Sequence, residues 1–261
     1  MTWQVWLTAL TLGAVGMGTL RADEKTVRQE LGAALKRYET LFQQSFSIPV
    51  KSPEINALIS QQVAIATRQA MGIPLQVNLS HFTYTYTPVA GQIKVHLADL
   101  APAQAEFMEK QANQLIQGSA LGQVLELVAF DALKEGILGL NTQKATCVLR
   151  RELPASADFA LPGGNRQLLP GLLLKESLFR FDRAAKAVTM LQFSFTNGTS
   201  MLARVKYVEV RLPSGASVPV PALAEITQDA MTTPQQGVTV PPKVTVQYGK
   251  CAFGGAAATG G

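Results

Sequence analysis

The first quarter of the chain has the hydrophobic spacing of two amphipathic helices. From Asp23 to Phe46, apolar residues recur every three or four positions with charged residues between them, which predicts a helix that Pro49 terminates. Ser52-Pro53-Glu54 then supplies a cap residue followed by proline at the first helical position. The apolar residues after it predict a second helix, which Gly72-Ile73-Pro74 ends.

Strict alternation of apolar and polar residues comes next, on both sides of a turn at Pro88–Gly91. This pattern predicts a β-hairpin in which Thr87 pairs with Gln92. One face then carries aromatic and aliphatic side chains, namely Phe82, Tyr84, Tyr86, Ile93, Val95 and Leu97. The other face is polar and includes His81 and His96, placed diagonally to each other. The hairpin is therefore predicted to have one buried and one solvent-facing side.

Helical spacing returns in the middle of the chain. Pro102 begins one predicted helix, and the apolar residues from Leu121 to Ile137 predict another, which Gly139 closes. Strand-like sequence resumes at Lys144–Leu153 and continues through most of the second half of the chain.

The second half of the chain is predicted to form strands separated by turns. A Pro/Gly-rich loop through Gly163-Gly164 precedes the strand LLLKESLFRFD, and a turn at Pro213-Ser214-Gly215 precedes VPVPALAEITQD. Lys243–Cys251 is the last predicted strand, and the small-residue tail 253–261 is predicted to be disordered. No linker divides the chain, so residues 23–252 are predicted to form a single domain.

The longest pair of apolar runs, LQFSFTNGTSMLARVKYVEV, is joined by Asn197-Gly198. Asn-Gly is the strongest sequence signal for a two-residue type I′ turn, because both residues tolerate positive φ. If Thr196 pairs with Thr199, one face carries Leu191, Phe193, Phe195, Leu202 and the stem of Arg204, and the other carries Met190, Ser194, Met201, Ala203, Val205 and Tyr207. Both faces are substantially apolar, so the sheet is predicted to be covered by helices on one side and by more sheet or a ligand on the other.

Composition indicates a chain that can build a sizeable core. Of the 261 residues, 47% are hydrophobic and 16% are charged. The formal net charge is +5, and from Gln143 onward 13 Lys and Arg face 7 Asp and Glu. A basic half can attract anionic partners such as lipid head groups or nucleic acid, or it can form an ordinary solvated surface. Nucleic acid is not expected, because Tyr84 and Tyr86 fall on the opposite face from Lys94.

The N-terminal sequence MTWQVWLTALTLGAVGMGTLRA has the character of an export signal. An uncharged apolar stretch from Trp3 to Leu20 is followed by small residues, which predicts a signal peptide at residues 1–22, cleavage after Ala22 and a periplasmic or secreted protein. The same stretch is just long enough to remain as a membrane anchor, and this alternative stays open. No later apolar run is long enough to cross a membrane, so no transmembrane segment is predicted in the mature chain.

The chain has two cysteines, Cys147 and Cys251. In an exported protein an even pair permits one disulfide, and both residues fall in predicted strands, so we expect them to be bonded. Two thiols and two histidines are too few for a typical metal site, and none is predicted.

Catalytic constellations are scarce in this sequence. His81 and His96 are its only histidines, and no Gly-x-Ser-x-Gly elbow is present. Gly163-Gly164-Asn165 lacks the helix and the Lys-Ser/Thr pair of a phosphate-binding loop. Glu176 and Asp182 share a strand face at a separation of about 20 Å, which is too long for a glycosidase carboxylate pair. The sequence therefore predicts no active site, no cofactor and no enzymatic activity.

The segment from Leu172 to Cys251 resembles the C-terminal half of the periplasmic lipoprotein carriers of the LolA/LolB type. A strand ends in Phe181-Asp182, a hairpin carries Gly198-Thr199, and Gly215-Ala-Ser-Val-Pro219 leads into the next strand. A helix soon after an export signal agrees with the same family. The chain departs from that family by a second helix before the first strands and by a two-helix segment in its middle.

This resemblance implies an α+β fold, in which an incomplete antiparallel β-barrel (a half-barrel) packs against the N-terminal and central helices around an apolar cavity. It implies a non-enzymatic carrier without a cofactor, with a lipid or the acyl chain of a lipoprotein as ligand and an envelope protein as a further partner. The candidate lining residues are Phe82, Tyr84, Tyr86, Phe193, Phe195 and Leu202. The alternative is a structural or interaction component of the cell envelope, whose core is filled by its own side chains.

Overall fold

The computed structural model describes residues 24–72, 78–88, 91–117, 134, 147–164, 167–169, 172–229, 232–233, 238–239 and 241–254. The predicted export signal, the residues beyond Gly254 and, apart from Lys134, the predicted helix from Leu121 to Gly139 lie outside this part of the chain. Within it, no helix combines the length and the apolar character needed to span a bilayer.

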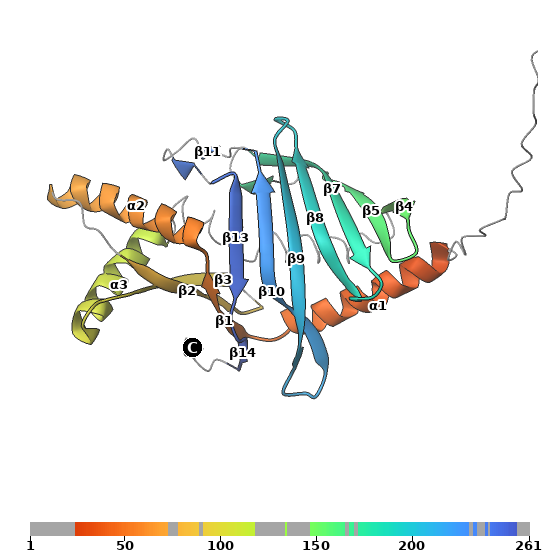
Figure 1. Cartoon of the computed structure of the whole chain (residues 1–261), viewed down its shortest axis with the longest axis horizontal. Coiled ribbons are helices and arrows are strands. Elements are labelled where there is room, and N and C mark those ends of the chain that lie inside the picture. Colours follow the sequence, from red (N-terminus) through yellow and green to blue (C-terminus); the bar gives the residue numbers. More distant parts are fainter. Residues whose placement is uncertain are drawn as a thin grey trace, which may run out of the picture.

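An antiparallel sheet of twelve strands forms most of the structure (Figure 1). Its strands are β1 (Phe46–Lys51), β2 (Leu79–Tyr86), β3 (Gly91–Leu97), β4 (Val148–Glu152), β5 (Ser156–Pro162), β6 (Gln167–Leu169), β7 (Leu172–Asp182), β8 (Ala187–Phe195), β9 (Ser200–Arg211), β10 (Ser217–Gln228), β13 (Lys243–Tyr248) and β14 (Ala252–Phe253). Their order is β3-β2-β1-β13-β10-β9-β8-β7-β5-β4, with β14 beside β1 and β6 beside β7. A separate ribbon pairs β11 (Thr232–Thr233) with β12 (Val238–Thr239).

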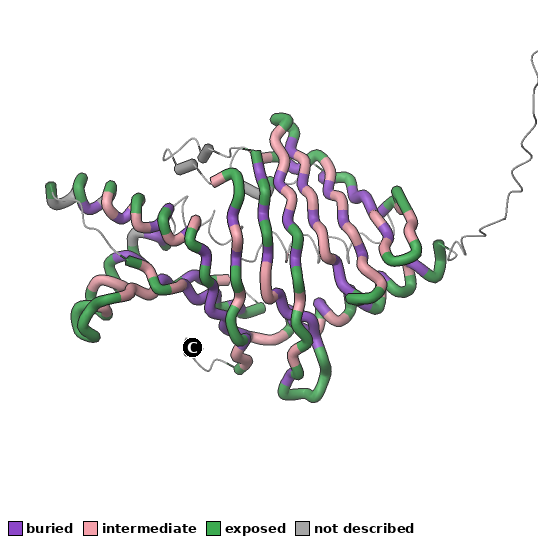
Figure 2. Tube along the Cα trace, in the orientation of Figure 1, coloured by how far each residue is buried: buried purple, intermediate pink, exposed green. Residues whose placement is uncertain are grey.

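Three helices accompany the sheet in the described part of the chain: α1 (Glu24–Phe42), α2 (Pro53–Met71) and α3 (Pro102–Ile116). The two ends of the strand order, β3 and β4, do not pair with each other, so the sheet stays open. The fold is therefore α+β, an open antiparallel half-barrel with helices packed on it, as the resemblance implies. Along most of its strands, buried and more exposed positions alternate, so the sheet has a covered face and an outer face (Figure 2).

Helix α1 lies against the covered face. Its buried residues are Val27, Leu31, Ala34, Leu35, Tyr38, Leu41 and Phe42, which recur at helical spacing. The Tyr38 ring packs edge-on against Tyr207 of β9, with ring centroids 5.6 Å apart, and Arg37 forms an ion pair with Glu209 on the same strand. Residues 205, 207 and 209 of β9 therefore point toward α1, and the residues between them point outward.

The first helix ends at Phe42, earlier than the predicted Phe46. Phe46–Lys51 forms strand β1 instead, in which Phe46 faces Tyr86, Ile48 faces Tyr84 and Val50 faces Phe82. The strand is a six-residue run between two strongly periodic helices, so the sequence pattern alone does not separate its apolar residues from the end of the first helix.

The β2–β3 hairpin forms as predicted but with its register shifted by two residues. Thr85, rather than Thr87, faces Gln92, and Tyr86 faces Gly91. A two-residue shift leaves each side chain on its predicted face, and Phe82, Tyr84, Tyr86, Ile93 and Val95 are all buried. Gly91 permits this pairing because an added Cβ would lie 2.4 Å from the Tyr84 hydroxyl.

The β8–β9 hairpin has a different turn from the predicted one. The prediction that Leu202 shares a face with Phe193 was therefore wrong. Gly198 N donates to Phe195 O at 3.1 Å and Phe195 N donates to Thr199 O at 2.9 Å, with Gly198 at φ +87°. This is a three-residue loop with a left-handed glycine, not a two-residue type I′ turn. The register therefore shifts by one residue, which moves Leu202 to the outer face and Met201 beside Phe193.

A further strand departs from the sequence prediction. Ser156–Pro162, predicted as part of the loop before Gly163, forms β5 and pairs along its length with β7. Phe159 faces Phe179 in this pairing, and both rings are buried. The short run SADFALP has little alternation of its own, so its strand conformation depends on the long neighbouring strand.

The expected disulfide is absent: Cys147 and Cys251 are both buried, and neither is bonded to another cysteine. Cys147 precedes β4 at one end of the sheet, whereas Cys251 precedes β14 at the other end (Figure 1). Strands β10, β9, β8, β7 and β5 lie between β13 and β4, so the two α-carbons are too far apart to be bridged. The strand order, which the sequence does not reveal, is what overturns this prediction.

Candidate functional site

The covered face of the sheet carries a continuous apolar surface, which we call the apolar face. One row across it runs Phe159, Phe179, Leu191, Ala203, Ile226 and Val244, each facing the next on the neighbouring strand. Phe193, Phe195 and Phe181 extend this row on β7 and β8, and Phe179 and Phe193 meet edge-on with centroids 6.5 Å apart. The apolar face therefore presents a band of phenylalanine rings over β5, β7 and β8.

The candidate lining residues fall into two groups on the apolar face. Phe82, Tyr84 and Tyr86 lie on β2, while Phe193 and Phe195 lie on β8, with β1, β13, β10 and β9 between the two strands. Each of these five side chains is at most 4% exposed. Leu202 belongs to neither group because it lies on the outer face.

The group on β2 contacts other aromatic side chains of the protein. The Tyr86 ring lies 5.7 Å from Phe42 and 5.1 Å from Phe46, measured between centroids, and its hydroxyl donates to Phe42 O at 3.0 Å. The Lys134 ammonium lies 5.2 Å from the centre of the same ring. Tyr86 is therefore held by protein contacts on several sides.

A cleft of about 340 Å³ opens between α1 and the turn that joins β7 to β8. Residues spaced three and four apart on one side of α1 form one wall, and β7 with its following turn forms the other. The lining residues are Glu30, Ala33, Ala34, Arg37, Phe181, Arg183 and Lys186. The sequence prediction missed this cleft, because only the packing of α1 against β7 brings the two segments together.

The charged side chains of the cleft are held in place by carboxylates. Arg183 Nη2 donates to Glu152 Oε1 at 2.9 Å, and Arg183 Nε lies 3.1 Å from Glu30 Oε2 without the alignment of a hydrogen bond. Arg37 donates to both carboxylate oxygens of Glu209. Burial opposes ionisation of Glu209, but the hydrogen bonds from Arg37 and Ser217 outweigh it and lower the pKa of this carboxyl.

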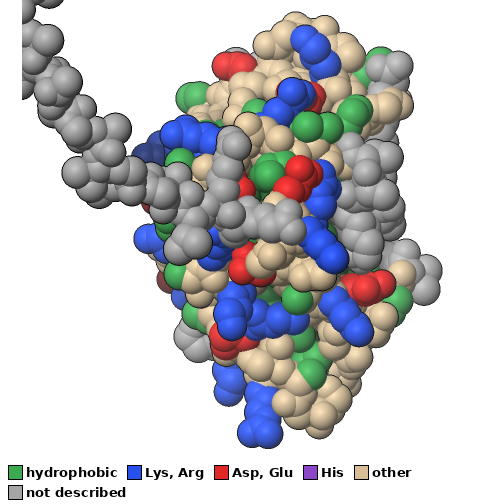
Figure 3. Space-filling model, turned by 90° about the vertical axis from the view of Figure 1, so that its right-hand side faces the viewer, with side chains coloured by type: hydrophobic (Ala, Val, Ile, Leu, Met, Phe, Trp, Pro, Cys, Tyr) green, Lys and Arg blue, Asp and Glu red, His purple; other side chains and the backbone are tan. Residues whose placement is uncertain are grey.

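Lys186 differs from these two arginines. It makes no hydrogen bond or ion pair in the described part of the chain, and its backbone is left-handed, with φ +48°. Figure 3 shows the end of the molecule on the right of Figure 1, where Lys and Arg side chains predominate over Asp and Glu.

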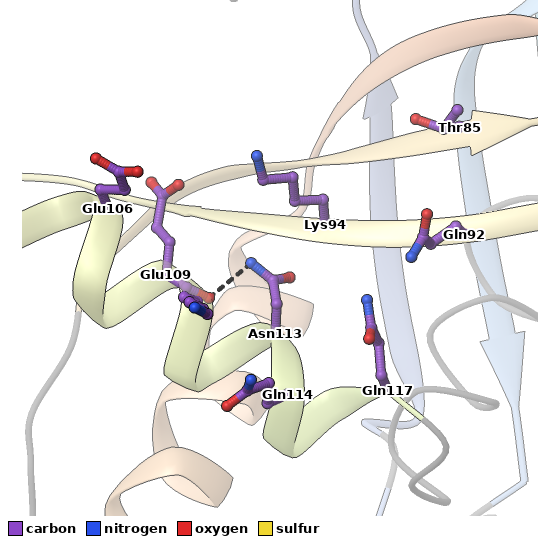
Figure 4. A pocket seen from close by; sticks show the side chains of 9 residues that line it. Thr85, Gln92, Lys94, Glu106, Glu109, Asn113, Gln114 and Gln117 are labelled. Atoms are coloured by element: carbon purple, nitrogen blue, oxygen red, sulfur yellow. Dashed lines mark hydrogen bonds between the residues drawn. The ribbon is translucent and has the colours of Figure 1, made fainter.

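A second cleft, of about 400 Å³, lies between β3 and α3 and is polar (Figure 4). Its lining residues are Thr85, Gln92, Lys94, Glu106, Glu109, Lys110, Asn113, Gln114 and Gln117. Asn113 is committed to the sheet edge, because its amide accepts from Val95 N at 2.8 Å and donates to Val95 O at 3.3 Å. Helix α3 thereby completes the hydrogen bonding of edge strand β3.

His81 and His96 lie next to this cleft and face each other directly, with stacked rings 4.6 Å apart. Ser80 Oγ lies 2.8 Å from His81 Nδ1, whereas the Glu109 carboxylate is paired with the other histidine, 3.6 Å from His96 Nδ1. Thr83 Oγ1 lies 3.0 Å from His96 Nε2, so a hydroxyl, an imidazole and a carboxylate follow one another at Thr83, His96 and Glu109, but the 3.6 Å contact between His96 and Glu109 is longer than a hydrogen bond. Within the described ranges, no three His, Cys, Asp or Glu side chains are grouped to hold a metal ion.

No protein-family model and no curated protein matches the chain. Two solved structures are similar to it in arrangement. A DUF1329 family protein from Desulfovibrio piger has a TM-score of 0.38 and 8% sequence identity, over an alignment that covers 89% of this chain and 95% of that one. A putative outer membrane lipoprotein-sorting protein domain from Vibrio parahaemolyticus has a TM-score of 0.32 and 6% identity, with 87% of this chain and 94% of that one covered. At these TM-scores neither similarity assigns a function, so the function rests on the residues of this chain.

Proposed function

We propose that the protein is an exported, non-enzymatic carrier that holds the acyl chain of a lipid or lipoprotein against the apolar face of its half-barrel. The observation that carries this proposal is the band of phenylalanine side chains over β5, β7 and β8, at the end of the sheet where the cleft beside α1 opens. Phe181 belongs to the band and also lines that cleft. An acyl chain entering beside α1 would meet Phe181 first.

The driving force for such binding is the removal of methylene groups from water. Each buried methylene contributes about 0.8 kcal/mol, so even part of an acyl chain would bind without any covalent chemistry. The small number of polar groups needed to orient a ligand is available at the cleft mouth, on Arg37, Arg183 and Lys186. Export is supported by the N-terminal sequence, with periplasm or secretion as its destination.

One observation favours the alternative, a structural or interaction component of the envelope with a filled core. Five of the six candidate lining residues are buried at 4% exposure or less, and Tyr86 and Phe193 pack against other aromatic rings of the protein. In that case the phenylalanine band serves packing alone.

Fluorescence titration of the delipidated protein with a fluorescent fatty-acid analogue separates the two functions. The matched variants are Phe193→Ser on the apolar face and Leu202→Ser on the outer face, on adjacent strands. A carrier binds the analogue, loses affinity in Phe193→Ser and keeps it in Leu202→Ser. If the parent protein binds no analogue and Phe193→Ser loses about 3–5 kcal/mol of folding free energy, the carrier is rejected and the filled core remains.

A further inference from the structure

We propose that the cleft between α1 and the β7–β8 turn binds the anionic head group, a carboxylate or a phosphate, of the amphiphile that the protein carries. This inference rests on the proposed carrier function and names the chemical class of its ligand. It assigns the head group to the cleft mouth and the acyl chain to the apolar face, with Phe181 at the junction of the two.

The inner part of the cleft is apolar, whereas its opening is lined by charged side chains. Ala34 and Phe181 are buried, at 3% and 1% exposure, and form its inner part. Arg37, Arg183 and Lys186 are less buried and lie with them around the same opening. A ligand that fills such a cleft must have an apolar end and a polar end, which excludes a simple inorganic anion as its best occupant.

The sign of the head group follows from the charges at the opening. Three of the lining residues are cationic and one, Glu30, is anionic. The other carboxylates that hold the arginines, Glu152 and Glu209, are not among the lining residues. An anion at the opening therefore meets two guanidinium groups already fixed in position and the Lys186 ammonium group, which is unpaired within the described ranges.

Arg37 retains donors for such an anion, whereas Arg183 donates from Nη1 to Pro154 O and from Nη2 to Glu152. Arg37 binds Glu209 through Nη2, and its Nε and Nη1 make no hydrogen bond in the described part of the chain. Guanidinium nitrogens fixed in this way can donate to a carboxylate or a phosphate with little loss of side-chain freedom. The cleft is thus preorganised by the same ion pairs that attach α1 to the sheet.

The turn that carries Lys186 supports the same assignment. Asp182 Oδ1 accepts from Ala185 N at 2.8 Å, and this bond closes the turn before Lys186 adopts its left-handed backbone. Glycine or asparagine would occupy that conformation at lower cost, yet the position holds a lysine that lines the cleft and has no ion-pair partner among the described residues. A residue held in an unfavourable backbone conformation beside a cleft is typical of binding sites, where such strain is often found.

The test uses an anionic probe, dansylaminoundecanoic acid, and its uncharged methyl ester, titrated into the delipidated full-length protein. Lys186→Asn removes the cleft charge while keeping a residue that tolerates positive φ, so it is expected to fold as well as the parent. Lys206→Gln is the matched control, because Lys206 is an exposed lysine on the outer face of β9. We expect Lys186→Asn to weaken binding of the acid about tenfold and to leave binding of the ester unchanged, with no effect of Lys206→Gln on either.

The possible results separate this inference from the function on which it rests. If the parent binds neither probe, the carrier function itself is contradicted. If the acid and the ester bind equally and Lys186→Asn shifts neither, the carrier stands and the head-group site is overturned. An equal loss in Lys206→Gln would also overturn it, because the effect would then be one of net charge.

Discussion

Phe193 on β8 lies directly opposite Met201 on β9, and not opposite Leu202. This pairing decides which side chains belong to the apolar face, because a shift of one residue would exchange the two faces of β9 relative to β8. It depends on the three-residue loop in which Gly198 has φ +87°. This one turn therefore decides which residues of β9 belong to the proposed lipid-binding surface.

The first prediction concerns that glycine. Gly198→Ala places a side chain in the left-handed region and should lower the free energy of unfolding by about 1–2 kcal/mol, measured by urea denaturation. Gly32→Ala is the matched control, since Gly32 lies inside α1 and an added Cβ would meet no atom within 4 Å. This second change should raise stability by about 0.5–1 kcal/mol. Equal effects of the two substitutions would argue against the assigned turn.

A second prediction tests the attachment of α3 to the sheet edge. Asn113→Ala removes the partner of both Val95 N and Val95 O and should cost about 1–3 kcal/mol of folding free energy. Gln114→Ala on the same helix changes an exposed residue and should have an effect within about 0.5 kcal/mol. Urea denaturation of both variants measures the difference. An Asn113→Ala protein as stable as Gln114→Ala would show that the hydrogen bonds from Asn113 to edge strand β3 do not contribute to stability.

A third prediction concerns the thiols of Cys147 and Cys251. Burial raises the pKa of Cys251 to about 12, and Cys147 is also buried, so neither should react with a thiol reagent in the native protein at about pH 8. After denaturation without reductant, both should be labelled. Mass spectrometry of the labelled chain counts the modified cysteines. A denatured chain that takes up no label would show that the two cysteines are bonded to each other after all.

A fourth prediction concerns the histidine pair. Burial is the main reason that the pKa values of His81 and His96 lie below 6.5, and for His81 the charge of His96 adds to it. The folded protein then binds fewer protons than the unfolded chain below about pH 6.5, so stability should fall as the pH drops through that value. The double variant His81→Gln, His96→Gln should lose less stability than the parent between about pH 7.5 and pH 5. Parallel pH profiles of urea midpoint would contradict this assignment.

Hydrophobic periodicity predicted the elements whose pattern is long enough to be distinctive. Helices α1, α2 and α3, the β2–β3 hairpin and strands β7 to β10 follow from spacing within each segment. Strands β1 and β5 were missed because they are short, and their conformation depends on long neighbours. The turn type at Gly198 was missed because Asn-Gly fits both a two-residue turn and the last two positions of a three-residue loop.

The candidate site was only partly within reach of the sequence. Alternation alone identified Phe193 and Phe195 as residues of one face, and both are buried on the apolar face. The cleft beside α1 joins Arg37 to Lys186, which are distant in the sequence, so no local pattern could reveal it. The separation of Cys147 from Cys251 depends in the same way on strand order.

Native mass spectrometry of the protein purified gently from its own host tests the carrier function most directly. We expect a non-covalent adduct that leaves on collisional activation and whose released mass identifies an acyl-bearing amphiphile with an anionic head group. A spectrum that contains only the bare chain in every charge state, together with a delipidated protein that binds no fatty-acid analogue, would contradict the carrier function.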